Sequence, residues 1–279
     1  MHPLHEKVIL ITGGSSGIGR AAALRLAGYG ARVAIAARNQ EALDEVVASA
    51  KASAAHILAV SADVTEAEQC HHAVEAAVGQ FGRLDVLICS AGLSMRSTFE
   101  DSDLAAMQQV MQVNFWGTLY STYYAIPHVK RTRGSLVAIS SLTGRRGIPS
   151  YSVYGASKFA VQGLYESLRL ELGREGVHVG VVSPSFLDTP LRQRVLGPDG
   201  QPWPEPPAVP LPLFPVEKCV DLIVRLIIRR RSQAVLPWRS SVFLKLEQVF
   251  GSWIGDRILR AKFPAVHGAK GPSTRRQSC

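Results

Sequence analysis

A tyrosine and a lysine four residues apart carry the clearest chemical signal in the sequence. Tyr154 and Lys158 lie in the run Ser-Tyr-Ser-Val-Tyr-Gly-Ala-Ser-Lys-Phe, residues 150–159. On a helix this spacing places both side chains on one face. A free tyrosine has a pKa of about 10, and a neighbouring ammonium would lower it toward the range useful for proton transfer. The pair is a candidate acid/base centre, although the same spacing is also common in surface pairs.

Two further polar residues fit the same centre. Ser141 lies 13 residues before Tyr154, immediately after an apolar run of strand length. Open α/β sheets present ligand-binding groups at the carboxyl ends of their strands. Asn114 lies within a long helical pattern over Asp103–Arg131. The candidate catalytic residues are therefore Asn114, Ser141, Tyr154 and Lys158.

The elements that must position these residues alternate in type along the first two-thirds of the chain. Six short runs are almost continuously apolar, as expected for strands covered on both faces. Amphipathic stretches of helical length separate them, for example 17–29, 40–52 and 66–81. This alternation predicts a parallel sheet with right-handed crossovers. The expected strands are Lys7–Thr12, Arg32–Ala37, His56–Ser61, Leu84–Cys89, Ser135–Ser140 and Val177–Ser183, with a further helix over Val216–Arg229 and a strand over Gln233–Leu236.

The predicted fold class is α/β, with a single doubly wound Rossmann domain. Its mostly parallel seven-stranded sheet is expected to be flanked by helices and followed by a C-terminal helical extension. We assign residues 1–240 to the catalytic domain and 241–279 to the extension and tail. Within the domain, residues 188–216 form a proline-rich substrate loop, since eight prolines between Pro198 and Pro215 exclude a regular helix.

A glycine-rich turn follows the first expected strand. The run Thr-Gly-Gly-Ser-Ser-Gly-Ile-Gly, residues 12–19, precedes an alanine-rich helix. Glycines allow the sharp turn and the close approach of a pyrophosphate, and the helix directs free N–H groups at that phosphate. Between a strand and a helix, this loop predicts dinucleotide binding. The residues assigned to the loop are Gly13, Ser15, Ser16, Gly17, Ile18 and Gly19.

The end of the second expected strand indicates which dinucleotide binds. A carboxylate there would accept hydrogen bonds from the adenosine ribose and repel a 2′-phosphate. The chain has Ala37 followed by Arg38, and a guanidinium suits a phosphate. NADP(H) is therefore favoured over NAD(H), with an ordinary surface arginine as the alternative for Arg38.

These motifs, in this order, resemble those of the short-chain dehydrogenase/reductase family over about residues 7–189. The resemblance implies that Tyr154 exchanges a proton with the substrate oxygen and that Ser141 hydrogen-bonds the same oxygen. It implies that Lys158 holds the nicotinamide ribose and lowers the tyrosine pKa, and that Asn114 helps to hold a water. The further cofactor contacts it implies are Asp63, Val64, Ser90, Ala91, Gly92, Tyr154, Lys158, Pro184, Leu187 and Thr189.

The chain departs from the family pattern at two positions. Cys89-Ser90-Ala91-Gly92 stands where the family usually has one or two asparagines before Ala-Gly. Ser90 can still hydrogen-bond, so we expect an altered sheet contact and retained cofactor binding. Ser185 replaces the glycine often found after Pro184.

Three features beyond the tetrad leave alternatives open. The proline-rich loop carries Trp203, Leu211, Leu213 and Phe214, which suggest either a hydrophobic lid over the substrate or a stiff surface loop. The stretch 242–263 is amphipathic and basic, and Gly251 and Gly255 are expected to divide it into two helices. It could pack on protein or rest peripherally on an anionic membrane. Arg145 and Arg146 could meet an acidic substrate or lie on an exposed loop.

The composition and charge of the chain limit the kinds of partner that it is expected to bind. The net charge of +9 is spread along the chain without a nucleic-acid motif, so no nucleic-acid partner is expected. The four cysteines and eight histidines lack metal-ligand spacing, and no metal is assigned. No signal peptide or spanning helix is expected, which favours the cytoplasm, with or without membrane association. The resemblance implies a homodimer or homotetramer formed through the helices over about 103–131 and 151–174.

The predicted function is an NADP(H)-dependent oxidoreductase that moves a hydride between nicotinamide and a carbonyl or secondary alcohol. The expected substrate is a bulky, lipophilic small molecule of steroid, retinoid or lipid type. A 3-oxoacyl-thioester reductase would use the same tetrad and is the alternative enzyme. The alternative outside enzymes is a catalytically idle NADP-binding sensor or scaffold.

Overall fold

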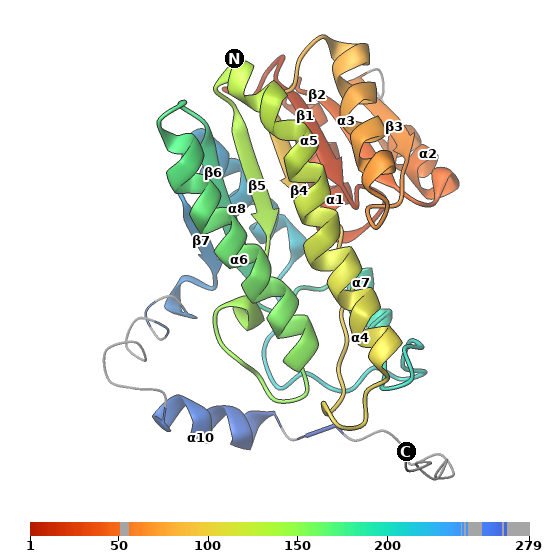
Figure 1. The fold of residues 1–279 in the computed structure, drawn as a ribbon, viewed down its shortest axis with the longest axis vertical. Helices are drawn as coiled ribbons and strands as arrows, with labels where there is room; N and C mark the ends of the chain where they lie inside the picture. Colours follow the sequence, from red (N-terminus) through yellow and green to blue (C-terminus); the bar gives the residue numbers. More distant parts are fainter. Residues whose placement is uncertain (51–55, 241, 243, 245–252, 264, 267–279) are drawn as a thin grey trace, which may run out of the picture.

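A parallel sheet of seven strands, in the order β3-β2-β1-β4-β5-β6-β7, forms the centre of the molecule (Figure 1). The computed structural model describes the chain except residues 51–55, 241, 243, 245–252, 264 and 267–279. The strands are β1 (Val8–Thr12), β2 (Arg32–Ala37), β3 (Ile57–Ser61), β4 (Val86–Cys89), β5 (Ser135–Ile139), β6 (His178–Pro184) and β7 (Gln233–Leu236). Each lies within two residues of its predicted bounds, and the predicted fold class is confirmed.

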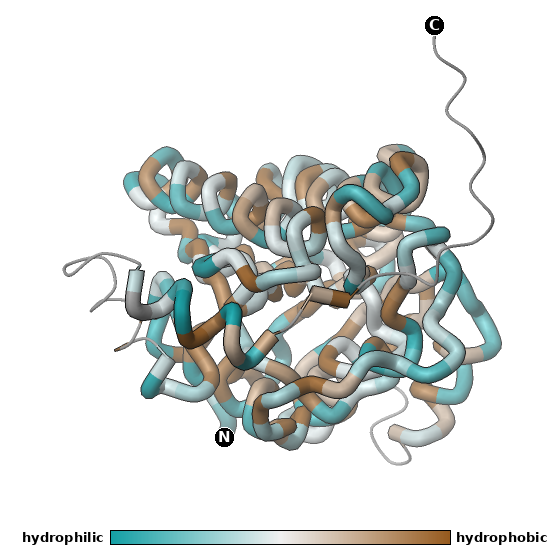
Figure 2. The backbone as a smooth tube through the Cα atoms, turned by 90° about the horizontal axis from the view of Figure 1, so that it is seen from below, coloured by the Kyte–Doolittle hydropathy of each residue, from teal (hydrophilic) through white to brown (hydrophobic). Residues whose placement is uncertain are grey.

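Helices cover both faces of the sheet. Those on one face are α1 (Gly17–Gly28), α2 (Gln40–Ser49) and α8 (Val216–Ile228); those on the other are α3 (Ala67–Phe81), α5 (Gly117–Thr132) and α6 (Ser152–Gly173). Successive residues of β1 alternate between the two resulting cores: Ile9 and Ile11 belong to the first, Val8 and Leu10 to the second. Figure 2 shows the matching alternation along the covering helices as brown and teal turns.

Short-range signals set several helix ends. The Asn39 side chain accepts a hydrogen bond from the Ala42 N–H at 2.9 Å and caps the start of α2. Asp103 caps α4 (Leu104–Met111) in the same way, through the Ala106 N–H at 3.0 Å. Helix α3 ends at Gly82, whose φ of 79° lies in the left-handed region that glycine adopts without strain.

The long helical stretch predicted over 103–131 contains a local irregularity. Helix α4 passes into a π-helical turn, η2 (Gln112–Trp116), before continuing as α5. Asn114 lies in this turn. Single π-helical turns inside α-helices are frequent at functional sites, because they turn one side chain away from the regular helical face.

The order of the strands places a crevice at one edge of the sheet. Strand β1 lies between β2 and β4, and the chain builds outward from β1 in opposite directions. At such a switch point the loops that follow neighbouring strands diverge, leaving a crevice outside the carboxyl ends of the strands. The loops after β1, β4, β5 and β6 all emerge at this edge.

The C-terminal third differs in two respects from its prediction. A short helix, α7 (Pro190–Gln193), precedes the proline-rich stretch, which is otherwise irregular as expected. Gly255 was expected to break a helix but lies inside α10 (Trp253–Lys262); Gly251 lies outside the described residues. No helix in the described part of the chain is both long and apolar enough to cross a membrane.

Candidate active site

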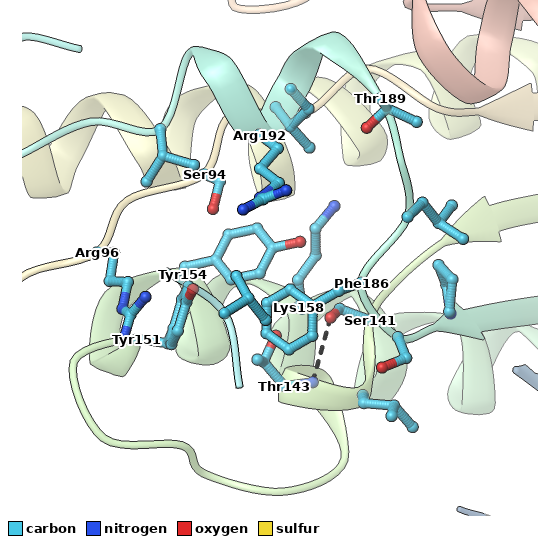
Figure 3. A pocket seen from close by; sticks show the side chains of 18 of the residues that line it. Ser94, Arg96, Ser141, Thr143, Tyr151, Tyr154, Lys158, Phe186, Thr189 and Arg192 are labelled. Carbon is cyan, nitrogen blue, oxygen red and sulfur yellow. Dashed lines mark hydrogen bonds between the residues drawn. The ribbon is translucent and has the colours of Figure 1, made fainter. Parts of the chain in front are cut away.

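The residues predicted to do chemistry meet at the carboxyl edge of the sheet. Ser141 follows β5, and Tyr154 and Lys158 lie in the first two turns of α6. All three line one pocket (Figure 3). The Ser141 hydroxyl accepts a hydrogen bond from the Thr143 N–H at 3.2 Å, which holds the turn after β5. The fold therefore brings three of the four candidate catalytic side chains into one cavity.

Tyr154 is a weaker acid than the sequence suggested. Burial raises the pKa of its hydroxyl to about 12, the neighbouring Ser141 hydroxyl lowers it, and Tyr151 raises it further. The Lys158 ammonium lies 5.9 Å from the centre of the tyrosine ring and donates a hydrogen bond to the Ile139 carbonyl at 3.1 Å. The expectation that Lys158 brings this pKa toward neutrality is not met in this structure, because burial outweighs the favourable contacts.

Burial also changes the pKa of Lys158. Its side chain is almost completely enclosed, and this burial lowers the pKa of the ammonium to about 8, while the Cys89 thiol raises it. A lysine in this environment changes charge in the mildly alkaline range rather than near its ordinary value. Lys158 is therefore the group of the pocket whose charge responds to pH closest to neutrality.

Asn114 lies behind the pocket and does not line it. Its side chain is fully buried, accepts a hydrogen bond from the Leu93 N–H at 2.8 Å, and donates to the Leu93 carbonyl and the Ser157 hydroxyl at 2.9 Å each. A Cβ added at Gly92 would lie 3.4 Å from Asn114 Oδ1 and 3.6 Å from Lys158 Nζ. Both side chains therefore border the same small space beside Gly92.

A groove adjoining this pocket collects most of the predicted cofactor residues. Those that line it are Gly13, Ser15, Ser16, Gly17, Ile18, Arg38, Asp63, Val64, Ser90, Ala91, Gly92 and Thr189. Pro184 and Leu187 line the pocket with Tyr154 and Lys158, and Gly19 lies beneath the loop. Ile18, Ser90, Gly92 and Thr189 border both spaces, so the groove and the pocket are continuous. Arg194 also lines the groove but was not predicted from the sequence. It lies after Thr189, the last residue of the motifs that carry the resemblance.

The glycine-rich loop has the tight geometry that a dinucleotide cradle needs. Gly13 has a φ of 70°, and a Cβ there would lie 2.7 Å from the backbone of Ala91. A Cβ at Gly19 would lie 2.2 Å from the Gly13 carbonyl oxygen. The backbone at Gly17, where α1 begins, also has a positive φ, 51°. These glycines fit a pyrophosphate, because they leave no Cβ at the turn where α1 presents its first backbone N–H groups.

Arg38 stands at the outer end of the groove. Its side chain is 74% exposed and lies 3.9 Å from the Asp63 carboxylate. A pair this exposed contributes little stability, so the guanidinium is free to approach a phosphate without a large loss.

The two departures from the family pattern have local effects. The Cys89 thiol lies against α5 and α6, 3.8 Å from the Thr122 hydroxyl and 3.6 Å from that of Tyr165. Ser90 remains at the groove, with its N–H donating to the Thr12 carbonyl at 3.2 Å. The Ser185 N–H donates to the Leu236 carbonyl at 2.8 Å and joins the end of β6 to β7.

The proline-rich loop contributes only part of what was predicted to the wall of the pocket. Leu211 lines it, together with Pro206, Pro207 and Val209. The Trp203 indole instead donates a hydrogen bond to the Arg96 carbonyl at 3.0 Å. Phe214 packs against the core beneath α1 and α8, and Leu213 is 37% exposed.

The C-terminal segment packs against the outer wall of the same pocket. Phe263 is buried and stacks on Phe186, a pocket residue, with 6.1 Å between ring centres. The Val266 backbone accepts a hydrogen bond from the Thr98 N–H at 3.1 Å and donates one to the Ser150 hydroxyl at 2.9 Å. Figure 1 shows α10 beyond the N-terminal end of α6, where Tyr154 lies.

The two arginines proposed for an acidic substrate are engaged elsewhere. Arg145 donates a hydrogen bond to the Gln233 side chain at 2.8 Å. Arg146 pairs with Asp256 of α10 and so helps to hold the C-terminal segment. Neither lines the pocket, because the turn after Ser141 directs both side chains away from it. Within the described residues, no group of His, Cys, Asp and Glu side chains could hold a metal ion.

Comparison with known proteins defines the class. Residues 7–198 match the short chain dehydrogenase family, and the chain belongs to it. It is 38% identical over 192 residues to 11-beta-hydroxysteroid dehydrogenase 1A of Arabidopsis thaliana, covering 68% of this chain and 55% of that protein. It is 32% identical over 268 residues to an 11-beta-hydroxysteroid dehydrogenase of Pinus massoniana, covering 93% of this chain and 75% of that protein. The match thus spans about half the length of the first of these relatives.

Solved structures agree with the fold. An alcohol dehydrogenase from the archaeon Thermococcus sibiricus, complexed with 5-hydroxy-NADP, superposes with a TM-score of 0.72 at 23% identity, over 82% of this chain and 95% of that one. ElxO with NADP bound superposes with a TM-score of 0.64 at 32% identity, over 66% of this chain and 75% of that one.

Proposed function

We propose that the protein transfers a hydride between NADP(H) and a carbonyl or secondary alcohol on a bulky, lipophilic small molecule. The observation that carries this proposal is the continuity of two spaces. The glycine-lined groove opens directly into an apolar pocket that holds Ser141, Tyr154 and Lys158. A catalytically idle NADP-binding protein would have no use for these three side chains together beside the cofactor groove.

The nicotinamide, when bound, supplies or accepts the hydride. The chain's own residues manage the proton and the oxygen. With a pKa of about 12, Tyr154 stays protonated at neutral pH and can donate to the substrate oxygen as negative charge develops there. Ser141 offers a second hydrogen bond to that oxygen. Lys158, which lines the same pocket, would place its positive charge near a bound nicotinamide ribose and the reacting oxygen.

A lipophilic substrate and NADP(H) are supported by separate features. The pocket wall is mainly apolar, with Leu142, Ile148, Phe186, Val195 and Leu211 among its lining residues. The relatives that match over this region are named hydroxysteroid dehydrogenases. Arg38 suits a 2′-phosphate, and both solved structures described above hold NADP or a derivative of it.

A substrate panel tests the function. NADPH oxidation should be detected with steroid, retinal or long aliphatic ketones, and NADH should be used at least about tenfold less efficiently, since each tenfold equals roughly 1.4 kcal/mol of lost phosphate contact. If only 3-oxoacyl thioesters are reduced, the protein is a 3-oxoacyl-thioester reductase and the lipophilic ketone substrates are rejected. If the protein binds NADPH but turns over no compound of the panel, it is an NADP-binding protein and the proposed enzymatic function is rejected.

Carbonyl reduction is expected to decline as the pH rises through about 8. Burial lowers the pKa of Lys158 to about 8, so its charge is present below that pH and lost above it, whereas Tyr154 keeps its proton up to about pH 12. The measurement is kcat/KM from about pH 6 to about pH 10. Lys158→Arg keeps its charge throughout, so its profile should stay flat at a lower overall rate. An unchanged decline in that variant would remove Lys158 as its cause.

We propose a homodimer as the smallest assembly. The exposed surface of α5 and α6 carries large apolar side chains, including Tyr123 at 67%, Phe159 at 45% and Leu170 at 69% exposure. Exposed apolar side chains gathered on neighbouring helices favour protein contact. Sedimentation that gives a monomer at micromolar concentration would reject the dimer.

We also propose peripheral contact with anionic membranes through residues 242–263. On α10, Trp253 is 63% and Ile258 40% exposed, and Arg257, Arg260 and Lys262 lie on the same helix. This combination suits the boundary of an anionic bilayer. Vesicles rich in phosphatidylserine should pellet the protein at low salt, and neutral phosphatidylcholine vesicles should not. Equal pelleting, or none, contradicts the contact.

A further inference from the structure

The apolar pocket contains positive charge that no protein carboxylate balances. Besides Lys158, the side chains of Arg96 and Arg192 line it. No aspartate or glutamate is among its lining residues. Within the described residues, neither arginine makes an ion pair. Arg96 is buried and Arg192 is partly buried. A charge withdrawn from water without a partner is costly, so such charges in a substrate pocket indicate a ligand that supplies the partner.

Arg96 is fixed in place but incompletely satisfied. It is only 3% exposed, and its Nη1 donates to the carbonyls of Pro207 and Ala208 at 3.1 and 2.8 Å. These bonds hold the proline-rich loop against the pocket. Its Nε is buried without a hydrogen-bond partner in the described structure. Two neutral carbonyls therefore position this guanidinium, and its charge remains uncompensated.

Arg192 is more available still. It lies on α7, immediately after the turn that follows β6, and its Nε is also buried without a partner. No hydrogen bond or ion pair from its side chain is found in the described part of the chain. In Figure 3 the Arg192 side chain descends into the pocket on the side where Tyr154 lies. Helix α7 thus delivers a guanidinium fork to the cavity and leaves it free to bind.

Tyr151 connects the two arginines. The Arg96 guanidinium lies 5.4 Å from the centre of the Tyr151 ring. Burial raises the pKa of the Tyr151 hydroxyl, and Arg96 and Arg192 both act in the opposite direction. Both guanidiniums are therefore close enough to act on the same hydroxyl. Figure 3 shows Arg96 and Tyr151 together, with Ser141 on the other side of the pocket.

We propose that Arg192 and Arg96, with the Tyr151 hydroxyl between them, form a subsite for a carboxylate on the substrate. The inference rests on the proposed function and narrows its substrate to an amphipathic oxo- or hydroxy-acid. The carbonyl or alcohol carbon lies at Ser141 and Tyr154, the apolar body contacts residues such as Phe186 and Leu211, and the carboxylate pairs with Arg192. Guanidinium groups bind carboxylates through two parallel charge-assisted hydrogen bonds.

The phosphates of the cofactor are the competing explanation for Arg192. The arginines that line the dinucleotide groove are Arg38 and Arg194, whereas Arg192 lines the substrate pocket alone. An arginine that bound the cofactor's phosphates would line the groove beside the glycine-rich loop, as the other two do. The placement of Arg192 therefore assigns it to the substrate.

The test compares a lipophilic keto acid with its methyl ester, which has the same body and no charge. Wild-type kcat/KM should favour the acid by at least about tenfold, the size of one charge-assisted contact. Arg192→Gln should reduce this preference to about one, leave the ester unchanged within about threefold and leave the Kd for NADPH unchanged within about twofold. Arg145→Gln, a nearby arginine outside the pocket, should keep the full preference for the acid.

Calorimetry supplies a readout that needs no turnover. A non-reducible analogue that carries the carboxylate but no ketone should bind the wild-type protein, and bind Arg192→Gln at least about tenfold more weakly. Equal use of acid and ester by the wild-type enzyme overturns the subsite and leaves the oxidoreductase intact. Loss of NADPH affinity in Arg192→Gln overturns it in favour of the cofactor. If no ketone is reduced, the proposed function fails, and the analogue titration alone decides the subsite.

Discussion

Replacing Tyr154 with phenylalanine is expected to lower kcat for carbonyl reduction by about 10²–10⁴-fold, the usual contribution of a positioned acid. The phenyl ring keeps the packing of this partly buried side chain, so only the hydroxyl is lost. Because that hydroxyl keeps its proton at neutral pH, with a pKa of about 12, it is the donor that the substrate oxygen loses. The measurements are steady-state NADPH oxidation and NADPH binding by calorimetry, with Kd unchanged within about twofold.

A matched control is available on the same helix. Tyr165 is fully buried on α6, where its hydroxyl pairs with that of Thr122 at 2.8 Å and does not line the pocket. Tyr165→Phe should therefore lose some stability, about 1 kcal/mol for one buried hydrogen bond, and keep kcat within about threefold. Turnover that survives in Tyr154→Phe would assign the proton to another donor and refute the mechanism proposed here.

The parts of the fold that depend on local pattern could be predicted from the sequence. Strand β2 has the predicted bounds, and β7 does too, because an apolar run between turn residues is a local signal. The glycine-rich loop was equally readable, since residue type, spacing and flanking elements all lie within about 25 residues. Boundaries shifted by a residue or two where a run continued past the last sheet pairing, as at Lys7 and Leu84.

What the sequence could not supply depends on which distant segments enclose a group. The Tyr154–Lys158 spacing was readable, but the pKa of Tyr154 depends on its burial, and that burial comes from other parts of the fold. The π-helical turn at Asn114 is likewise invisible in a continuous helical pattern. For Tyr154 and Asn114 alike, the sequence identified the residue but not the structure that surrounds it.

The sequence was also unable to indicate which arginines line the substrate pocket. Arg145 and Arg146 were considered for an acidic substrate because they lie between Ser141 and Tyr154 in the chain, with an exposed loop as the alternative. The structure turns them outward and brings in Arg96, from the loop after β4, and Arg192, from α7. Proximity in sequence could not decide between the two alternatives, because a substrate pocket in this fold is assembled from loops that follow several different strands.

Substituting alanine for Gly19 is expected to disrupt the cofactor groove from beneath. The new Cβ would lie 2.2 Å from the Gly13 carbonyl oxygen, 2.8 Å from its carbon and 3.1 Å from the Gly14 Cα. All three are backbone atoms, so the loop itself must move. Overpacking of this kind costs about 1–3 kcal/mol of folding free energy. The displaced N–H groups should weaken NADPH binding at least about tenfold, since each tenfold corresponds to only about 1.4 kcal/mol.

Gly28, at the other end of α1, provides the comparison. It is exposed, a Cβ there would meet nothing within 4 Å, and its backbone lies outside the left-handed region. Gly28→Ala should raise the free energy of unfolding by about 0.5–1 kcal/mol, because alanine loses less backbone entropy in a helix. Urea denaturation and NADPH titration distinguish the two variants. Normal NADPH affinity in Gly19→Ala would show that the dinucleotide does not rest on this loop, because no side chain elsewhere could compensate for the displaced backbone N–H groups.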